Sequence, residues 1–256
     1  MLRQHVTINR FRMNTIAAFF VGSGIVSALV IASDLPRRKQ SMKIMNSVWI
    51  LTGLWGGFFA LWAYFRFGRA KRSAPVAVPM RMEAPDAGSM PMGNKAETRM
   101  PMDMGRDRPK WQSVVLSTLH CGAGCTLADL IGESFLYFVP VAIGGSAVVG
   151  GWALDYALAL CIGVYFQYAA IRSMQMLPRK QAVVHALKAD FLSLTAWQAG
   201  MYAWMAVVIW VLFRETGLSK MSWTFWFMMQ TAMFVGFLAA LPMNVWLIRK
   251  GVKKGM

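Results

Sequence analysis

Six long apolar runs without lysine or arginine constrain the fold of this chain more than any other feature. They cover residues 15–33, 46–65, 113–139, 150–171, 191–213 and 223–248. Each run approaches or exceeds the roughly 20 residues that an α-helix needs to cross the hydrocarbon core of a bilayer. Only 15% of the residues are charged, against about 25% in soluble domains. The pattern predicts an all-α, polytopic integral membrane protein with about six transmembrane helices, whose first partner is the lipid bilayer.

The strong positive charge of the chain is confined to the segments between these runs. The formal net charge is +16, and all 27 Lys and Arg residues lie in connections or tails. This placement argues against a nucleic-acid partner. With six crossings and a cytoplasmic N-terminus, 21 basic residues fall inside and 6 outside, which predicts that both termini are cytoplasmic. The first hairpin fits least well, because its four basic residues must then lie outside.

A change of composition divides the chain into three parts. Residues 1–65 are predicted to form an N-terminal pair of transmembrane helices. Residues 66–110 are rich in Met, Pro, Gly and charge, a composition that buries too little apolar surface to fold alone, so we predict a flexible linker. Residues 111–256 are predicted to form a four-helix transmembrane domain.

The segment HCGAGCTLADLIGE, residues 120–133, carries residues that lipid tolerates poorly. Cys121, Cys125, Asp129 and Glu133 recur every four residues, which places them in a slowly turning polar stripe about 18 Å long on one helix face. Close helix packing alone would explain the glycines and one cysteine. It would not explain two carboxylates, which cost about 2.5–3.5 kcal/mol each in a membrane helix. We therefore interpret the stripe as functional.

The two thiols of this segment are compatible with a soft metal ion or with redox chemistry. Thiolates favour Cu(I) or Zn(II), and zinc is less expected because zinc signatures usually show two ligand pairs. His120 projects about 100° away from Cys121 on a regular helix. It either joins the thiols where Gly122 and Gly124 loosen the backbone, or it faces a different helix. Alternatively, Cys121 and Cys125 form a dithiol/disulfide couple, since their spacing lies near the upper limit for a bridge.

Two further polar residues, His185 and Asp190, precede or begin the fifth apolar run. A joint metal site is geometrically allowed for His120, Cys121, Cys125 and His185. An ion or proton path is predicted along Asp129, Glu133 and Asp190. The methionines within the last two runs are predicted to be core filler. These are Met201, Met205, Met228, Met229 and Met233.

The linker carries seven methionines in M-x-M clusters ten residues apart. They are Met80, Met82, Met90, Met92, Met100, Met102 and Met104. Methionine is not typical of disordered linkers, whereas clustered thioethers can capture Cu(I). The two interpretations, a soft-metal collector and a repeat-expanded tether without a ligand, stay open.

Three segments carry a resemblance to a known family. They are STLHCGAGCTLADLIGE, HALKADFLSLTAWQAGMY and LPMNVWLIRKGVKKGM, in this order. From about residue 114 to 256 the chain resembles a family of bacterial polytopic membrane proteins of unknown function with an HCGAGC-type motif. The resemblance implies a bacterial inner (plasma) membrane location and a loose association with copper. It also implies that His120, Cys121, Cys125, Asp129, Glu133, His185 and Asp190 matter.

Three functions are compatible with these features, and none assigns a catalytic residue. The first is binding or relay of copper(I) through the Cys-x-x-x-Cys site and the Met-rich linker, with a copper chaperone or exporter as a partner. The second is a membrane thiol/disulfide redox protein. The third is a proton- or cation-coupled transporter that uses Asp129 and Glu133. We expect a binding or transport protein rather than an enzyme.

Overall fold

The computed structural model describes residues 2–38, 40, 42–69, 110–174, 178–214 and 217–253. Within this part of the chain the protein is helical and contains no β-strand. The helices are α1 (Leu2–Asp34), α2 (Ile44–Ala63), α3 (Lys110–Phe138), α4 (Ala147–Met174), α5 (Arg179–Val207) and α6 (Trp223–Arg249). Short π-helical turns, Tyr64–Gly68 and Val208–Leu212, extend α2 and α5. All six helices are long and apolar enough to cross a membrane, so the predicted all-α, multi-pass membrane fold is confirmed.

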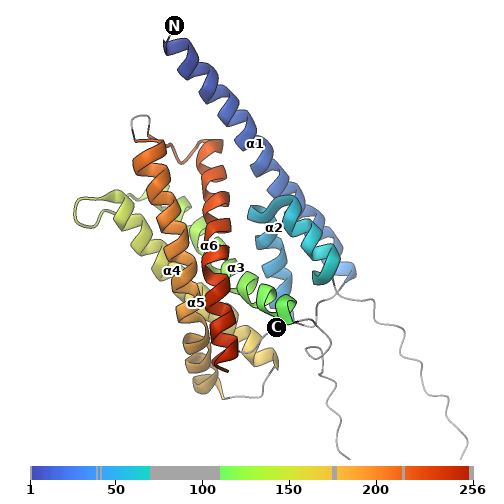
Figure 1. The fold of residues 1–256 in the computed structure, drawn as a ribbon. Helices are drawn as coiled ribbons and strands as arrows, with labels where there is room; N and C mark the ends of the chain where they lie inside the picture. Colours follow the sequence, from blue (N-terminus) through green and yellow to red (C-terminus); the bar gives the residue numbers. More distant parts are fainter. Residues whose placement is uncertain are drawn as a thin grey trace, which may run out of the picture.

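Helix α3, which carries the polar stripe, lies at the centre of the molecule (Figure 1). In its most apolar stretch, 72% of the residues are buried, against 28–39% in the other five helices. A helix so enclosed is shielded from lipid on most of its surface, which explains how it can carry thiols and carboxylates within the membrane.

Small residues allow the neighbouring helices to approach α3 closely. A Cβ atom at Gly124 would lie 2.8 Å from the Cα of Gly163, so the backbones of α3 and α4 touch at this point. A Cβ atom at Gly122 would overlap the ring of Trp197 on α5. Small residues at contacts of this kind are typical of helix packing in membranes, where close van der Waals fit drives association.

Helix α2 is folded back on itself rather than extended. Gly57 has φ +49° and ψ −130°, a backbone conformation that glycine adopts readily and that breaks the helix near its middle. The chain then returns, so that Asp34 at the end of α1 accepts hydrogen bonds from Tyr64 (2.9 Å) and Arg69 (2.8 Å from Nε). Gln40 also donates to the Gly68 carbonyl at 2.9 Å. Both ends of α2 therefore lie beside the end of α1 (Figure 1).

This hairpin determines which connections share an end of the molecule. The ring of Phe67, at the end of α2, contacts Trp111 at the start of α3. At the opposite end, Thr224 at the start of α6 donates a hydrogen bond of 2.7 Å to Asn14 on α1. The α3–α4 and α5–α6 connections lie toward that second end (Figure 1). The chain thus traverses the bundle five times, and α2 enters and leaves from one end.

Candidate functional site

A network of polar groups is buried where the C-terminal turn meets α3 and α5. After α6, Gly251 adopts φ +71°, the Gly251 amide bonds to the Ile248 carbonyl, and the Val252 amide bonds to the Leu247 carbonyl. This is a Schellman motif, which reverses the chain direction at a helix end. The reversal directs Lys253 into the bundle, where its Nζ lies 2.8 Å from Asp190 Oδ1 and both side chains are 0% exposed.

The thiol pair lies next to this ion pair. Cys121 and Cys125 are both completely buried and lie within hydrogen-bonding reach of each other. The Ser193 hydroxyl donates a hydrogen bond to Cys121 Sγ at 3.2 Å and accepts one from Lys253 Nζ at 3.4 Å. Ser193 thus connects the thiol of Cys121 to the buried ion pair of Lys253 and Asp190.

The two histidines of the predicted metal set do not join the thiols. His120 is buried, but its ring packs against Phe166 of α4, with ring centroids 6.1 Å apart. His185 is exposed on α5. Within the described residues, no group of three or more His, Cys, Asp or Glu side chains could hold a metal ion. The physical reason is that α3 stays regular through its glycines, so His120 keeps the 100° offset from Cys121 and faces a different helix.

The carboxylates of the stripe form a separate group nearer the other end of the molecule. Asp129 is buried, and neither carboxylate oxygen has a hydrogen-bond partner in the described part of the protein. The carboxylates of Asp155 on α4 and of Glu133 lie near enough to interact with it electrostatically. Glu133 forms an ion pair of 2.5 Å with Lys220 in the α5–α6 connection. The predicted path is therefore divided: Asp129 and Glu133 belong to this group, whereas Asp190 belongs to the thiol network.

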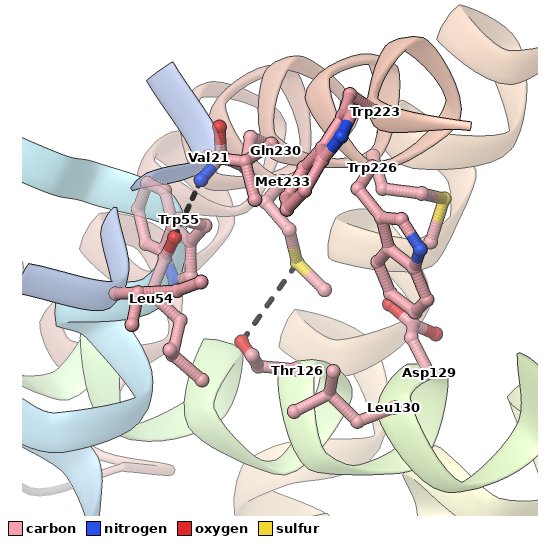
Figure 2. A pocket seen from close by; sticks show the side chains of 12 residues that line it. Val21, Leu54, Trp55, Thr126, Asp129, Leu130, Trp223, Trp226, Gln230 and Met233 are labelled. Carbon is pink, nitrogen blue, oxygen red and sulfur yellow. Dashed lines mark hydrogen bonds between the residues drawn. The ribbon is translucent and has the colours of Figure 1, made fainter. Parts of the chain in front are cut away.

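A cavity of about 300 Å³ opens beside Asp129, between α1, α2, α3 and α6. Figure 2 shows Asp129 close to Trp226, with Met233 directing its sulfur into the space above α3. The Thr126 hydroxyl oxygen lies 3.8 Å from that sulfur. Met229 also lines the cavity. The cavity is thus mainly apolar, and the carboxylate that lines it has no hydrogen-bond partner among the described residues.

The five methionines that were predicted to be core filler share one buried cluster with the two thiols. Seven sulfur-bearing side chains are therefore in a single core: Cys121, Cys125, Met201, Met205, Met228, Met229 and Met233. Their helical spacing is compatible with ordinary core packing, and sequence reasoning had no means of placing them beside the thiols. The third cysteine, Cys161, is exposed on α4. The seven linker methionines lie outside the described residues.

Sequence reasoning also missed Lys253, Ser193, Asp155 and Lys220. Lys253 and Lys220 resemble ordinary basic residues of a tail and a loop. The only available signal for Lys253 was the glycine two positions earlier, which predicts a helix-ending turn but not the direction of the following side chain.

Comparison with known proteins adds a family assignment but no activity. No curated protein and no solved structure matches this chain. One family model matches residues 110–253, from the first residue of α3 through the buried Lys253. Because this match covers more than half of the chain, the protein belongs to the family described as domain of unknown function DUF4396.

Proposed function

We propose that this membrane protein binds copper(I) in the membrane interior through Cys121 and Cys125. The observation that carries the proposal is the contact between two fully buried thiols inside a core that also contains five methionine side chains. Thiolate and thioether sulfurs are the ligands that Cu(I) prefers. The Ser193 hydroxyl, which donates to Cys121 Sγ and accepts from Lys253 Nζ, fixes the position of one of the two thiols.

The donor set fits Cu(I) better than zinc. Structural zinc sites take four ligands in tetrahedral geometry. Among the described residues, no third His, Cys, Asp or Glu joins the two thiols in a group that could hold a metal ion. Neutral thioethers, by contrast, can complete the surroundings of a soft monovalent ion without adding charge. His120 and His185 are not needed in this scheme.

The charge distribution supports an orientation for the protein. The connections and tail at the end of the molecule that holds both ends of α2 contain 22 of the 27 basic residues. The other end has five, namely Arg3, Arg10, Arg12, Arg214 and Lys220. By the positive-inside rule the first end is cytoplasmic. We infer that the C-terminus is cytoplasmic and that α1 begins on the opposite side, because α2 does not cross. This differs from the expectation that both termini are cytoplasmic.

In this orientation the Met-rich linker begins and ends on the cytoplasmic side. We propose that it collects or releases Cu(I) there and that a copper chaperone or exporter is its partner. The membrane is proposed to be a bacterial inner membrane. A linker deletion would lower copper loading in cells while leaving the Cys-dependent copper of the purified protein in place.

The test is the metal content of detergent-purified protein from cells supplied with copper and zinc, measured by inductively coupled plasma mass spectrometry. We expect about one copper ion per chain in the wild type, because one thiol pair binds one soft ion. We expect no copper in the Cys121→Ser/Cys125→Ser variant. Cys161→Ser is the matched control, because this cysteine is exposed, whereas both members of the pair are buried. Equal copper in the double variant and the control would refute the proposal.

The same thiol contact favours a second function, a dithiol/disulfide couple. Positions four residues apart on a helix lie within reach of a disulfide. Rapid thiol trapping followed by mass spectrometry would detect an intramolecular disulfide after oxidant exposure. A pair that stays reduced under oxidant and also binds no copper would exclude both thiol functions.

A third function, proton- or cation-coupled transport, is favoured by the unpartnered carboxylate of Asp129. An isolated buried carboxylate must take up a proton or a cation. This function predicts that Asp129→Asn abolishes uptake while Cys121→Ser does not. The reverse result would leave the thiol pair as the functional centre.

A further inference from the structure

The cavity beside Asp129 has features of a binding site separate from the thiol pair. It holds about 300 Å³ and lies between four helices, near the end of the molecule at which α6 begins. Asp129 is only 3% exposed, and both of its oxygens lack hydrogen-bond partners among the described residues. The nearby ammonium of Lys220 is already paired with Glu133. A positive ligand in the cavity would therefore supply the charge that Asp129 lacks.

The walls of the cavity restrict the kind of cation that it can accept. Three tryptophans line it, Trp55, Trp223 and Trp226, together with the methionines Met229 and Met233. Aromatic faces and thioether sulfurs attract cations that are weakly hydrated and polarisable. Hard ions such as Na⁺ or Mg²⁺ need several oxygen ligands. Among the residues that line the cavity, only Asp129, Thr126 and Gln230 carry side-chain oxygens, so the lining suits a soft ion better than a hard one.

The cavity is continuous with the sulfur cluster. Met229 and Met233 are four residues apart on α6 and therefore share one helix face. Both line the cavity and both belong to the buried cluster that contains Cys121 and Cys125. Figure 2 shows the Met233 sulfur facing the Thr126 hydroxyl of α3. A soft ion in the cavity would thus already contact the sulfur-lined core.

We propose that this cavity is a second, outer binding site for Cu(I), with Met229 and Met233 as sulfur ligands and Asp129 as the counter-charge. The proposal rests on the proposed copper function, because the outer site would exchange Cu(I) with the thiol pair. Trp226 lies close to Asp129 and forms one wall of this site (Figure 2).

The test uses the full chain with Cys121→Ser/Cys125→Ser, so that the thiol site is absent. The probe is Ag(I) alone, a redox-stable analogue of Cu(I), titrated in chloride-free detergent buffer while tryptophan fluorescence is recorded. Saturable quenching is expected, and Met229→Leu/Met233→Leu should weaken it about tenfold or more, as loss of ion-supporting groups usually does. Asp129→Asn should weaken it in the same direction. Met243→Leu is the control, because this methionine lies on the same helix but neither lines the cavity nor belongs to the buried sulfur cluster.

Three results would overturn the outer site. The first is an absence of saturable quenching by Ag(I), and the second is equal quenching in Met229→Leu/Met233→Leu and in the control. The third is quenching by tetraethylammonium but not by Ag(I), which would assign the cavity to organic ammonium ions. These outcomes are distinct from failure of the thiol site. Failure of the thiol site would appear as equal copper content in the wild type and in the Cys121→Ser/Cys125→Ser variant. The Ag(I) titration is independent of that result, because the protein titrated has no thiol pair.

Discussion

Replacing Lys253 by Met removes an ammonium that is completely buried and bonded to three oxygens. Its Nζ lies 2.8 Å from Asp190 Oδ1, 3.4 Å from Ser193 Oγ and 3.5 Å from the Ser117 carbonyl oxygen. Without it, the carboxylate of Asp190 is left in the core with no cation at hydrogen-bonding distance in the described structure. Removing one partner of a buried ion pair typically destabilises a protein by about 3–5 kcal/mol. We expect Lys253→Met to lie in this range.

A second ion pair provides the internal comparison. Lys220 and Glu133 are 2.5 Å apart, closer than the buried pair, but the Lys220 side chain is 38% exposed. Solvent screening reduces such pairs to about 0–1 kcal/mol. Lys220→Met should therefore lower the free energy of unfolding much less than Lys253→Met does, although Lys220 forms the shorter salt bridge. The comparison separates the effect of burial from the effect of distance.

The double variant Asp190→Asn/Lys253→Met distinguishes loss of a contact from stranding of a charge. Because it removes both charges, its stability should return to within about 1–2 kcal/mol of the wild type. The measurement is reversible unfolding by SDS in detergent micelles, followed by far-UV circular dichroism. The reasoning is refuted if Lys253→Met and Lys220→Met unfold at the same SDS fraction, or if the double variant is as unstable as Lys253→Met.

Three other predictions concern the hairpin and the helix contacts. Gly124→Ala should destabilise the bundle by about 1–3 kcal/mol relative to Gly22→Ala in the same SDS titration, because a Cβ at Gly124 meets the Gly163 backbone whereas one at Gly22 meets nothing within 4 Å. Gly57→Ala should cost about 1–2 kcal/mol, since an L-residue is strained at φ +49°; stability equal to Gly22→Ala would contradict the bend. For the third prediction, one cysteine is introduced at the N-terminus and another at Arg69. In intact cells a membrane-impermeant maleimide should label the N-terminal cysteine but not the one at position 69. Labelling of both or of neither would contradict the five-crossing arrangement.

The amino-acid sequence alone was sufficient to predict the membrane class and the principal polar helix. The apolar runs are local features, because every residue in lipid must satisfy its backbone within its own helix. The four-residue spacing of Cys121 and Cys125 likewise predicts a shared helix face, and the structure brings these two side chains together. Both conclusions depend only on the periodicity of one segment.

The path of the second apolar run could not be predicted in this way. Its length equals that of a crossing helix, and only the φ angle of Gly57 and the bonds of Asp34 to Tyr64 and Arg69 show that it folds back. These bonds join residues 30 and 35 positions apart, so no local pattern indicates them. The sequence contains one indication that the second run does not cross: the four basic residues of the first hairpin fit the positive-inside rule poorly.

The composition of the candidate site was decided by tertiary structure. Whether His120 faces the thiols depends on the regularity of α3, whose glycines permitted either outcome. Lys253 reaches Asp190 across 63 residues, and methionines of α5 and α6 belong to the same buried cluster as the thiols of α3. The periodicity of a helix determines which of its residues share a face, but only the packing of that face against distant helices determines which side chains meet there.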